Sequence, residues 1–394
     1  MSTVSAADAA SYAASHELYA TALRHELAPP ADGADPYAEW RDAHYPSAEE
    51  QSAGDGRLLA RLHDGGWNRF GWPEDAGGLG GDLRHRAVLY DELAAAGLGV
   101  PQPTLVLETL SPPLLHFAPE LAAMMLPRAL QGLEWWGQGF SEPEAGSDLA
   151  SLRCRARRDG DSYVVSGQKL WTSQGPTAAR FVCLVRTGTP ESRHRGLSMI
   201  VIDRDLPGVT VRPVAIASGR HDLAEVFFDD VRVSADRLIG EENAGWAVAM
   251  YLLQFERSMY AWQSAAVCLH RFNHLLTETV GRPGTAALTS RIGEVYSDLI
   301  TLRARSAQTI RRLVAGENIG PEAGVDKIAL ARAELAIHDL ARDVYGAEFA
   351  LGDSPTAQQW REEWWYSRSA PILGGSAEVQ RTIIADHVLG LPKE

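Results

Sequence analysis

The chain has 394 residues, enough for two or three domains or for one large unit with a substantial core. Its net charge of −14 leaves no basic stripe to neutralise phosphates, so we expect no nucleic-acid partner. It has neither an apolar run long enough to span a membrane nor a basic segment followed by an apolar run near its start. We therefore expect a cytoplasmic protein that does not associate with a membrane.

Residues 1–135 are rich in Ala and Leu and predict a helical unit. Helical stretches such as Arg57–His63 and Arg84–Ala96 are separated by loops that contain Gly and Pro. Gly77–Gly81 precedes the second of these stretches but does not have the GxGxxG spacing of a phosphate-binding loop. A turn before a helix is the better interpretation of this segment.

Residues 136–240 change to short runs of β-forming residues, separated by turn residues such as Asp159–Asp161 and Pro207-Gly208. The predicted strands are Ser162–Ser166, Phe181–Arg186, Leu197–Asp203, Val209–Val214 and Glu225–Val233. Short strands of this kind favour an antiparallel sandwich or barrel.

Residues 241–394 return to helical periodicity, and Pro283-Gly284 and Gly320-Pro321 interrupt it. The predicted helices are Ala244–Thr279, Ser290–Ala315, Gly324–Gly346 and Ala377–Leu389. The predicted fold class is therefore mainly α with an inserted β domain. It comprises a helical domain (1–135), a β domain (136–240) and a C-terminal helical bundle (241–394).

The metal-binding and reactive residue types show no site of their own. The cysteines are Cys154, Cys183 and Cys268. An odd, widely spaced set predicts reduced thiols rather than disulfides or a zinc site. The histidines lack metal-ligand spacing, so we expect no metal. Lysine occurs only at Lys169, Lys327 and Lys393, which we interpret as a coding bias toward Arg.

Three segments carry most of the chemical information. Gln138–Asp148 (QGFSEPEAGSD) has the composition of a loop and is dense in hydroxyl groups and glycine. Gly167–Ser173 (GQKLWTS) follows a predicted strand and offers an indole beside hydroxyl groups. Leu373–Arg381 (LGGSAEVQR) opens the last helix, where free N–H groups suit an anion. Each segment alone could be a turn or a cap, but the three in this order are specific.

At these segments the chain resembles the acyl-CoA dehydrogenase family, and the resemblance runs from Trp67 to Pro392. The first segment is similar to the family's loop ending in E-P-x-A-G-S-D. The second is similar to its G-x-K-x-W-I-T-N, with Thr172-Ser173 in place of Ile-Thr. The resemblance implies that FAD lies between the β domain and the C-terminal bundle. It also implies α,β-dehydrogenation of an acyl thioester to the 2-enoyl thioester.

The resemblance further implies roles for individual residues. Those implied at the cofactor are Gln138, Phe140, Ser141, Ser147, Trp171, Thr172, Ser173, Ser376 and Glu378. Those implied at the substrate are Ser147, Gln254, Arg257 and Gly375. For Arg257 a contact with the CoA portion and a structural ion pair remain equal alternatives.

The reaction needs a carboxylate to remove the α-proton of the thioester. Most of the family places that Glu where this chain has Gly374. The isovaleryl- and long-chain-like subgroup instead places it on a C-terminal helix before an Arg, which Leu253–Arg257 matches. Glu256 lies four residues from Leu252, toward a semi-apolar face of that helix. We predict that Glu256 is the base, rather than a solvated helix charge. By resemblance the backbone N–H of Gly374 then polarises the thioester carbonyl.

Two stretches depart from the family pattern. Thr279–Gly284 and Arg342–Ala347 lack the R-x-x-F-G and Q-x-x-G-G that normally bind the FAD adenosine across a subunit interface. The chain in this respect resembles bacterial members that act on bulky substrates, so a homodimer or homotetramer and a hetero-oligomer both remain open. We expect an electron-transfer flavoprotein as acceptor. The alternatives are an acyl-carrier-protein-linked dehydrogenase, an oxidase, and a catalytically silent subunit of a heteromeric complex.

Overall fold

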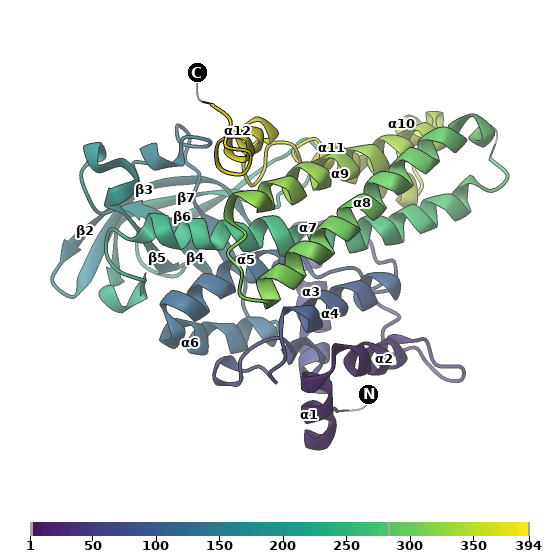
Figure 1. The fold of residues 1–394 in the computed structure, drawn as a ribbon, viewed down its shortest axis with the longest axis horizontal. Coiled ribbons are helices and arrows are strands. Elements are labelled where there is room, and N and C mark those ends of the chain that lie inside the picture. Colours follow the sequence, from purple (N-terminus) through teal and green to yellow (C-terminus); the bar gives the residue numbers. More distant parts are fainter. Residues whose placement is uncertain (1–2, 283, 393–394) are drawn as a thin grey trace.

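The computed structural model describes residues 3–282 and 284–392, in which helices precede and follow a single sheet (Figure 1). The sheet lies at one end of the molecule, and the long C-terminal helices extend away from it. The N-terminal helices pack beside both. This arrangement confirms the fold class predicted from the sequence. Strands begin at Trp136 and end at Ile239, and the domain boundaries at 135 and 240 stay a proposal.

The N-terminal part is helical, as predicted. Its helices are α1 (Ala6–Ala14), α2 (His16–Leu27), α3 (Ala48–Gly65), α4 (Leu83–Ala95), α5 (Gln102–Phe117) and α6 (Pro119–Leu130). Asp82 caps α4 by accepting from the backbone N–H of Arg84, directly after the Gly77–Gly81 segment. A Cβ at Gly78 would lie 2.0 Å from the carbonyl oxygen of Trp72, so this segment is a tight turn.

The sheet is mixed rather than purely antiparallel. Its strands are β1 (Trp136–Gly139), β2 (Arg155–Asp159), β3 (Ser162–Ser173), β4 (Arg180–Arg186), β5 (Leu197–Asp203), β6 (Val209–Val214), β7 (Leu223–Ser234) and β8 (Leu238–Ile239). They follow the order β6-β7-β3-β2-β4-β5-β8, with β1 beside β4. Both β1 and β2 pair with β4 in parallel. Most neighbouring strands pair antiparallel, as expected, and the two parallel pairings arise because crossovers rather than hairpins connect β1 and β2 to β4.

The C-terminal part is a bundle built on three long helices. Its helices are α7 (Gly245–Thr279), α8 (Thr289–Val314), α9 (Ala323–Tyr345), α10 (Ala347–Leu351), α11 (Pro355–Ser367) and α12 (Ala377–His387). Helices α7, α8 and α9 pack against one another, and α11 and α12 cover α9. Their shared core includes Phe272, Leu302 and Ile337. Pro283, expected to separate the first two helices, lies outside the described residues.

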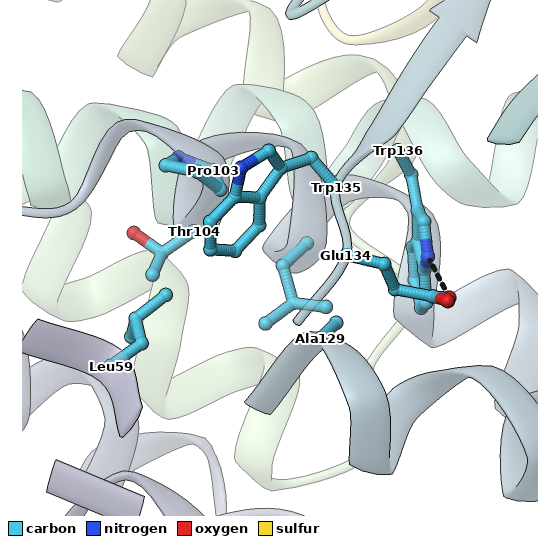
Figure 2. A pocket seen from close by; sticks show the side chains of 8 residues that line it. Leu59, Pro103, Thr104, Ala129, Glu134, Trp135 and Trp136 are labelled. Carbon is cyan, nitrogen blue, oxygen red and sulfur yellow. Dashed lines mark hydrogen bonds between the residues drawn. The ribbon is translucent and has the colours of Figure 1, made fainter. Parts of the chain in front are cut away.

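Glu134 joins the helical part to the sheet. Its carboxylate accepts from Arg128 on α6 at 2.7 Å and from Arg180 on β4 at 3.1 Å. Figure 2 shows the third bond, from Nε1 of Trp136 at 3.1 Å. The small cavity in this view lies beside Trp135, and none of the residues predicted for the functional site lines it. It therefore belongs to the packing of the N-terminal helices.

The three cysteines are buried and free. In the described part of the chain, no group of three His, Cys, Asp or Glu residues could hold a metal ion. Within the described residues, 3–282 and 284–392, no helix is long and apolar enough to cross a membrane.

Candidate active site

Glu256 lies on the side of α7 that faces the first strand of the sheet. Val248, Ala249 and Leu252 bury this side of the helix in the core shared with β1, β4 and β5. Glu256 follows Leu252 by one helical turn. There Nε2 of Gln138 donates to Oε2 of Glu256 at 3.1 Å. An amide and a carboxylate far apart in the sequence thus meet where α7 passes β1.

Gly374 approaches the other oxygen of the same carboxylate. It has a φ of +64°, which favours glycine. A Cβ at this position would lie 2.8 Å from Oε1 of Glu256 and 3.4 Å from Cε of Lys327. A side chain at 374 and the carboxylate of Glu256 would therefore compete for the same space. The two alternative positions of the family's base converge on one point in the fold.

Gly375 is also held open beside this point. Its φ is +94°, and a Cβ would lie 2.4 Å from Nε2 of Gln380 and 3.8 Å from the Arg257 guanidinium. Gln380 is fully buried on α12, and its Nε2 approaches the Gly374 carbonyl oxygen at 3.5 Å. Two consecutive glycines thus leave the backbone of this turn accessible between α7 and α12.

Arg257 and Gln254 are buried on α7 beside Glu256. Nε of Arg257 and Oε1 of Gln254 have no hydrogen-bond partner in the described part of the chain. Burial lowers the pKa of Arg257, and Glu256 opposes this shift. No carboxylate among the described residues forms an ion pair with this guanidinium, so the structure gives no support to the ion-pair alternative. A buried guanidinium whose Nε has no acceptor fits a position at the substrate.

Lys327 is a member of the site that the sequence reasoning missed. It is buried on α9, and its Nζ donates to the carbonyl oxygen of Ala370, four residues before Gly374. Burial lowers the pKa of Lys327, whereas Glu334 and Glu256 oppose this shift. The interpretation of the lysines as a coding bias is therefore incomplete, because Lys327 anchors the turn that carries Gly374.

A second buried lysine supports the loop between β1 and β2. Lys169 is fully buried, and its Nζ lies 2.7 Å from Oε1 of Glu142. It also donates to the carbonyl oxygens of Phe140 at 3.2 Å and Leu184 at 2.6 Å. One ammonium group thus ties residues 140–142 to β3 and β4. Its three N–H donors all have acceptors.

The residues of this loop differ in their exposure to solvent. Phe140 is buried, Ser141 is half-buried, and Ser147 is exposed. The carbonyl oxygen of Ser141 accepts from the Leu170 backbone N–H at 2.9 Å, which places it beside the edge of β3. The first residues of the predicted loop, Gln138 and Gly139, belong to β1 instead.

The segment predicted to line the flavin completes β3 rather than following it. The pairing with β7 shifts register between Lys169 and Thr172, and Trp171 in this bulge has a φ of +61°. The Trp171 side chain is 51% exposed. Thr172 is buried, and its Oγ1 has no partner among the described residues. Ser173 is half-buried and pairs with Leu223.

Of the two residues at the start of α12 that are predicted to contact the cofactor, one lies at the candidate site. Oγ of Ser376 accepts from the backbone N–H of Val379 at 3.3 Å and caps the helix directly after Gly375. Glu378 instead has an exposed side chain that pairs with Arg381 at 3.6 Å. The structure therefore places Ser376 at the candidate site and Glu378 at the surface.

Four residues predicted for the site or next to it carry buried polar atoms with no hydrogen-bond partner in the described part of the chain. They are Thr172 Oγ1, Gln254 Oε1, Arg257 Nε and Gln380 Oε1. Buried polar atoms in folded proteins nearly always have partners. Together with the open turn at Gly374-Gly375, these residues fit polar ligands bound between the two parts.

Comparison with known proteins covers almost the whole chain. Sequence models of the acyl-CoA dehydrogenase N-terminal, middle and C-terminal domains match residues 19–132, 137–231 and 243–389. Acyl-CoA dehydrogenase IpdE1 of Mycobacterium tuberculosis is 36% identical over 350 residues, which are 88% of this chain and 89% of that protein. Cyclohexane-1-carbonyl-CoA dehydrogenase of Geobacter metallireducens is 30% identical, with 85% and 90% covered.

Solved structures show the same likeness. The Tcur3481-Tcur3483 steroid ACAD superposes with a TM-score of 0.78 at 27% identity, over 95% of this chain and 98% of that one. The ChsE4-ChsE5 complex from Mycobacterium tuberculosis gives 0.77 at 27% identity, over 96% and 98%. The chain belongs to the acyl-CoA dehydrogenase family, whose members are FAD-dependent oxidoreductases that dehydrogenate acyl-CoA thioesters.

Proposed function

We propose that Glu256 is the base that removes the α-proton of an acyl-CoA thioester in this chain. The observation that carries this proposal is the position of its Oε1, 2.8 Å from the point that a Cβ of residue 374 would occupy. Relatives that keep their base at that position would direct a carboxylate to the same place. The absence of a side chain at 374 leaves room there for the carboxylate of Glu256.

FAD, bound between the sheet and the C-terminal helices, would supply the acceptor for the hydride that leaves the β-carbon. Ser141, Trp171, Thr172 and Ser173 would hold it on the sheet side, and Ser376 on the α12 side. The electron pair of the α-carbon's C–H bond would remain with the substrate as the proton moves to Oε1. The hydride departs from the β-carbon, and the 2-enoyl thioester forms.

The surrounding charges suit this chemistry. Lys327 and Arg257 are buried cations, and the carboxylate of Glu256 counteracts the lowering of the pKa of each by burial. The backbone N–H of Gly374 is the proposed donor to the thioester carbonyl oxygen, where negative charge develops. The proposed donor would then act from the turn before α12, and the proposed base from α7.

Glu256→Gln tests the base directly. The glutamine has the same shape and can still accept the hydrogen bond from Gln138, but it cannot accept the α-proton. We expect this variant to retain FAD but not to bleach it anaerobically with any of a panel of thioesters. The panel comprises isovaleryl-, octanoyl-, palmitoyl- and cyclohexane-1-carbonyl-CoA and the CoA thioester of a steroid carboxylic acid. Bleaching at the wild-type rate would remove Glu256 from the mechanism. The exposed Glu120 on α6, changed to Gln, is the matched control.

A positional exchange gives a second test. In Glu256→Gly/Gly374→Glu the carboxylate returns to the same region from the other backbone position. We expect bleaching to recover well above the level of Glu256→Gly alone. Equal rates in these two variants would show that the convergence of the positions has no chemical meaning.

We also propose that a second subunit of unlike sequence completes the adenosine end of the FAD site. Arg282 of the first departing stretch donates to Glu348 at 2.9 Å and lies 4.4 Å from the Tyr345 ring. Its guanidinium is thus engaged within the chain. The ChsE4-ChsE5 complex, a similar structure, is a pair of unlike chains. Light scattering and flavin absorbance of the chain purified alone test this: a homotetramer with one FAD per subunit would refute it.

For the electron acceptor we propose an electron-transfer flavoprotein. The exposed edge of Trp171 beside the flavin position supports transfer at the surface. Reoxidation of the bleached enzyme should therefore be faster with such a flavoprotein than with air. Stoichiometric hydrogen peroxide formation at full rate in air would instead identify an oxidase.

A further inference from the structure

The middle of β1 presents one side chain to the base. In Trp136–Gly139, the two glycines lie on the side of Phe181 and Cys183, their partners on β4. A Cβ at Gly137 would be 2.9 Å from the Phe181 ring, and one at Gly139 would be 2.5 Å from the Cys183 sulfur. Because side chains alternate along a strand, Gln138 faces the opposite side, toward α7. Trp136 lies on the same side of the strand, but its Nε1 donates to Glu134.

The Gln138 amide distinguishes the two oxygens of the Glu256 carboxylate. It donates to Oε2 at 3.1 Å, whereas Oε1 is the atom directed at the Gly374 turn. With Oε2 occupied, the carboxylate cannot rotate without losing this bond. We infer that Gln138 is the positioning residue of the base: it reserves Oε1 for the α-proton. This inference rests on the proposed role of Glu256.

The chemistry of an amide suits this task. A glutamine amide stays uncharged over the whole working pH range, and it can donate to Oε2 before and after Oε1 gains the proton. The charged groups that interact with Glu256 are Lys327 from α9 and Arg257 on α7 itself. From β1 the carboxylate meets only the neutral amide. The Gln138 side chain thus orients the base, whereas the two cations set its electrostatic surroundings.

The test compares Gln138→Leu and Gln138→Glu in the full-length chain. The substrate is the panel member that bleaches the wild-type flavin fastest, and flavin reduction is followed anaerobically across a pH series. Loss of a hydrogen bond to a charged group predicts a roughly 10- to 100-fold lower reduction rate for Gln138→Leu. The substrate concentration that gives half the maximal rate should change little. The acid side of the pH profile should move to higher pH, because the ionised base has lost a donor.

The side chain introduced by Gln138→Glu has nearly the size of the native one. This variant therefore still tests the inference if Gln138→Leu does not retain its flavin. It places two carboxyl groups within hydrogen-bond distance, so the acid side of the profile should move to higher pH by more than in Gln138→Leu. The matched control is Gln358→Leu, which removes a 3.3 Å bond to Glu362 on the exposed face of α11. Its rate and pH profile should equal those of the wild type.

The outcomes separate this inference from the proposed base. A flavin-loaded Gln138→Leu with the wild-type rate and pH profile overturns the role of Gln138. So does a Gln138→Glu protein whose profile is unchanged. If Glu256→Gln still bleaches normally, the base itself is wrong. If only Glu256→Gln abolishes bleaching, the base stands and the positioning role falls.

Discussion

Replacing Lys169 with Met tests whether the buried ion pair holds the loop between β1 and β2. Methionine keeps most of the side-chain volume but removes the ammonium that lies 2.7 Å from Glu142. Glu142 would then remain buried with two backbone donors, Arg153 N at 2.6 Å and Cys154 N at 2.9 Å. Two carbonyl oxygens would also lose their donor. Breaking one side of a buried pair costs about 3–5 kcal/mol of unfolding free energy.

Urea denaturation followed by far-UV circular dichroism measures this loss. Lys169→Met should lower the free energy of unfolding by about 3–5 kcal/mol, and adding Glu142→Gln should recover part of it, since no unpaired charge remains. The control is Arg232→Met at the exposed pair with Asp159, 2.8 Å long, where about 1 kcal/mol or less is expected. A loss below about 1 kcal/mol for Lys169→Met, or no recovery in the double variant, would refute the reasoning.

Three further predictions follow from single positions. Gly374→Ala places a methyl group 2.8 Å from Oε1 of Glu256. The carboxylate must move to relieve this contact. A misplacement of about 1 Å should slow flavin reduction roughly 100-fold while FAD content stays normal. Burial raises the pKa of Asp55 to about 7, so the folded state holds a proton that the unfolded chain releases near pH 4. Stability conferred by the protonated form is then lost as pH rises from about 4 to about 7. Asp55→Asn should remove this slope from urea midpoints measured across that range; an unchanged slope would contradict it. Trp171→Gly relieves a left-handed backbone, so the urea midpoint of the apoprotein should not fall, while FAD affinity measured by fluorescence titration drops roughly tenfold. Unchanged affinity would remove Trp171 from the flavin site.

Local patterns predicted the regular strands and long helices but not the elements that contradict local rules. Leu197–Asp203 and Val209–Val214 alternate or run apolar between turns, and the structure has β5 and β6 with these bounds. Trp136–Gly139 was not predicted, because two glycines weaken the signal of a strand. Its extended form depends on β4 beside it. Likewise Pro112 and Pro113 lie inside α5, where tertiary packing outweighs their low helix propensity.

The sequence predicted several residues of the candidate site but neither Lys327 nor the geometry. The resemblance names Glu256 and Gly374 as alternative positions for one group, whereas only the fold shows that they meet. The bond between Gln138 and Glu256 depends on where α7 passes β1, which no spacing in the sequence encodes. The same holds for Arg257, because only its neighbours in space show that its Nε has no hydrogen-bond partner among the described residues.

The scarcity of lysine contains a signal that composition alone hides. Where nearly every basic position is Arg, a retained Lys marks a place that a guanidinium does not suit. Lys169 is fully buried, and its three acceptors surround one nitrogen, as a tetrahedral ammonium requires but a planar guanidinium cannot match. Lys327 is similarly enclosed, with its Nζ on a backbone carbonyl and its stem against Gly374. Lys393 lies outside the described residues. Lys169 therefore supports the loop that follows β1, and Lys327 supports the turn that approaches Glu256. The acceptors around each lysine explain why an ammonium suits these two positions, which composition alone does not show.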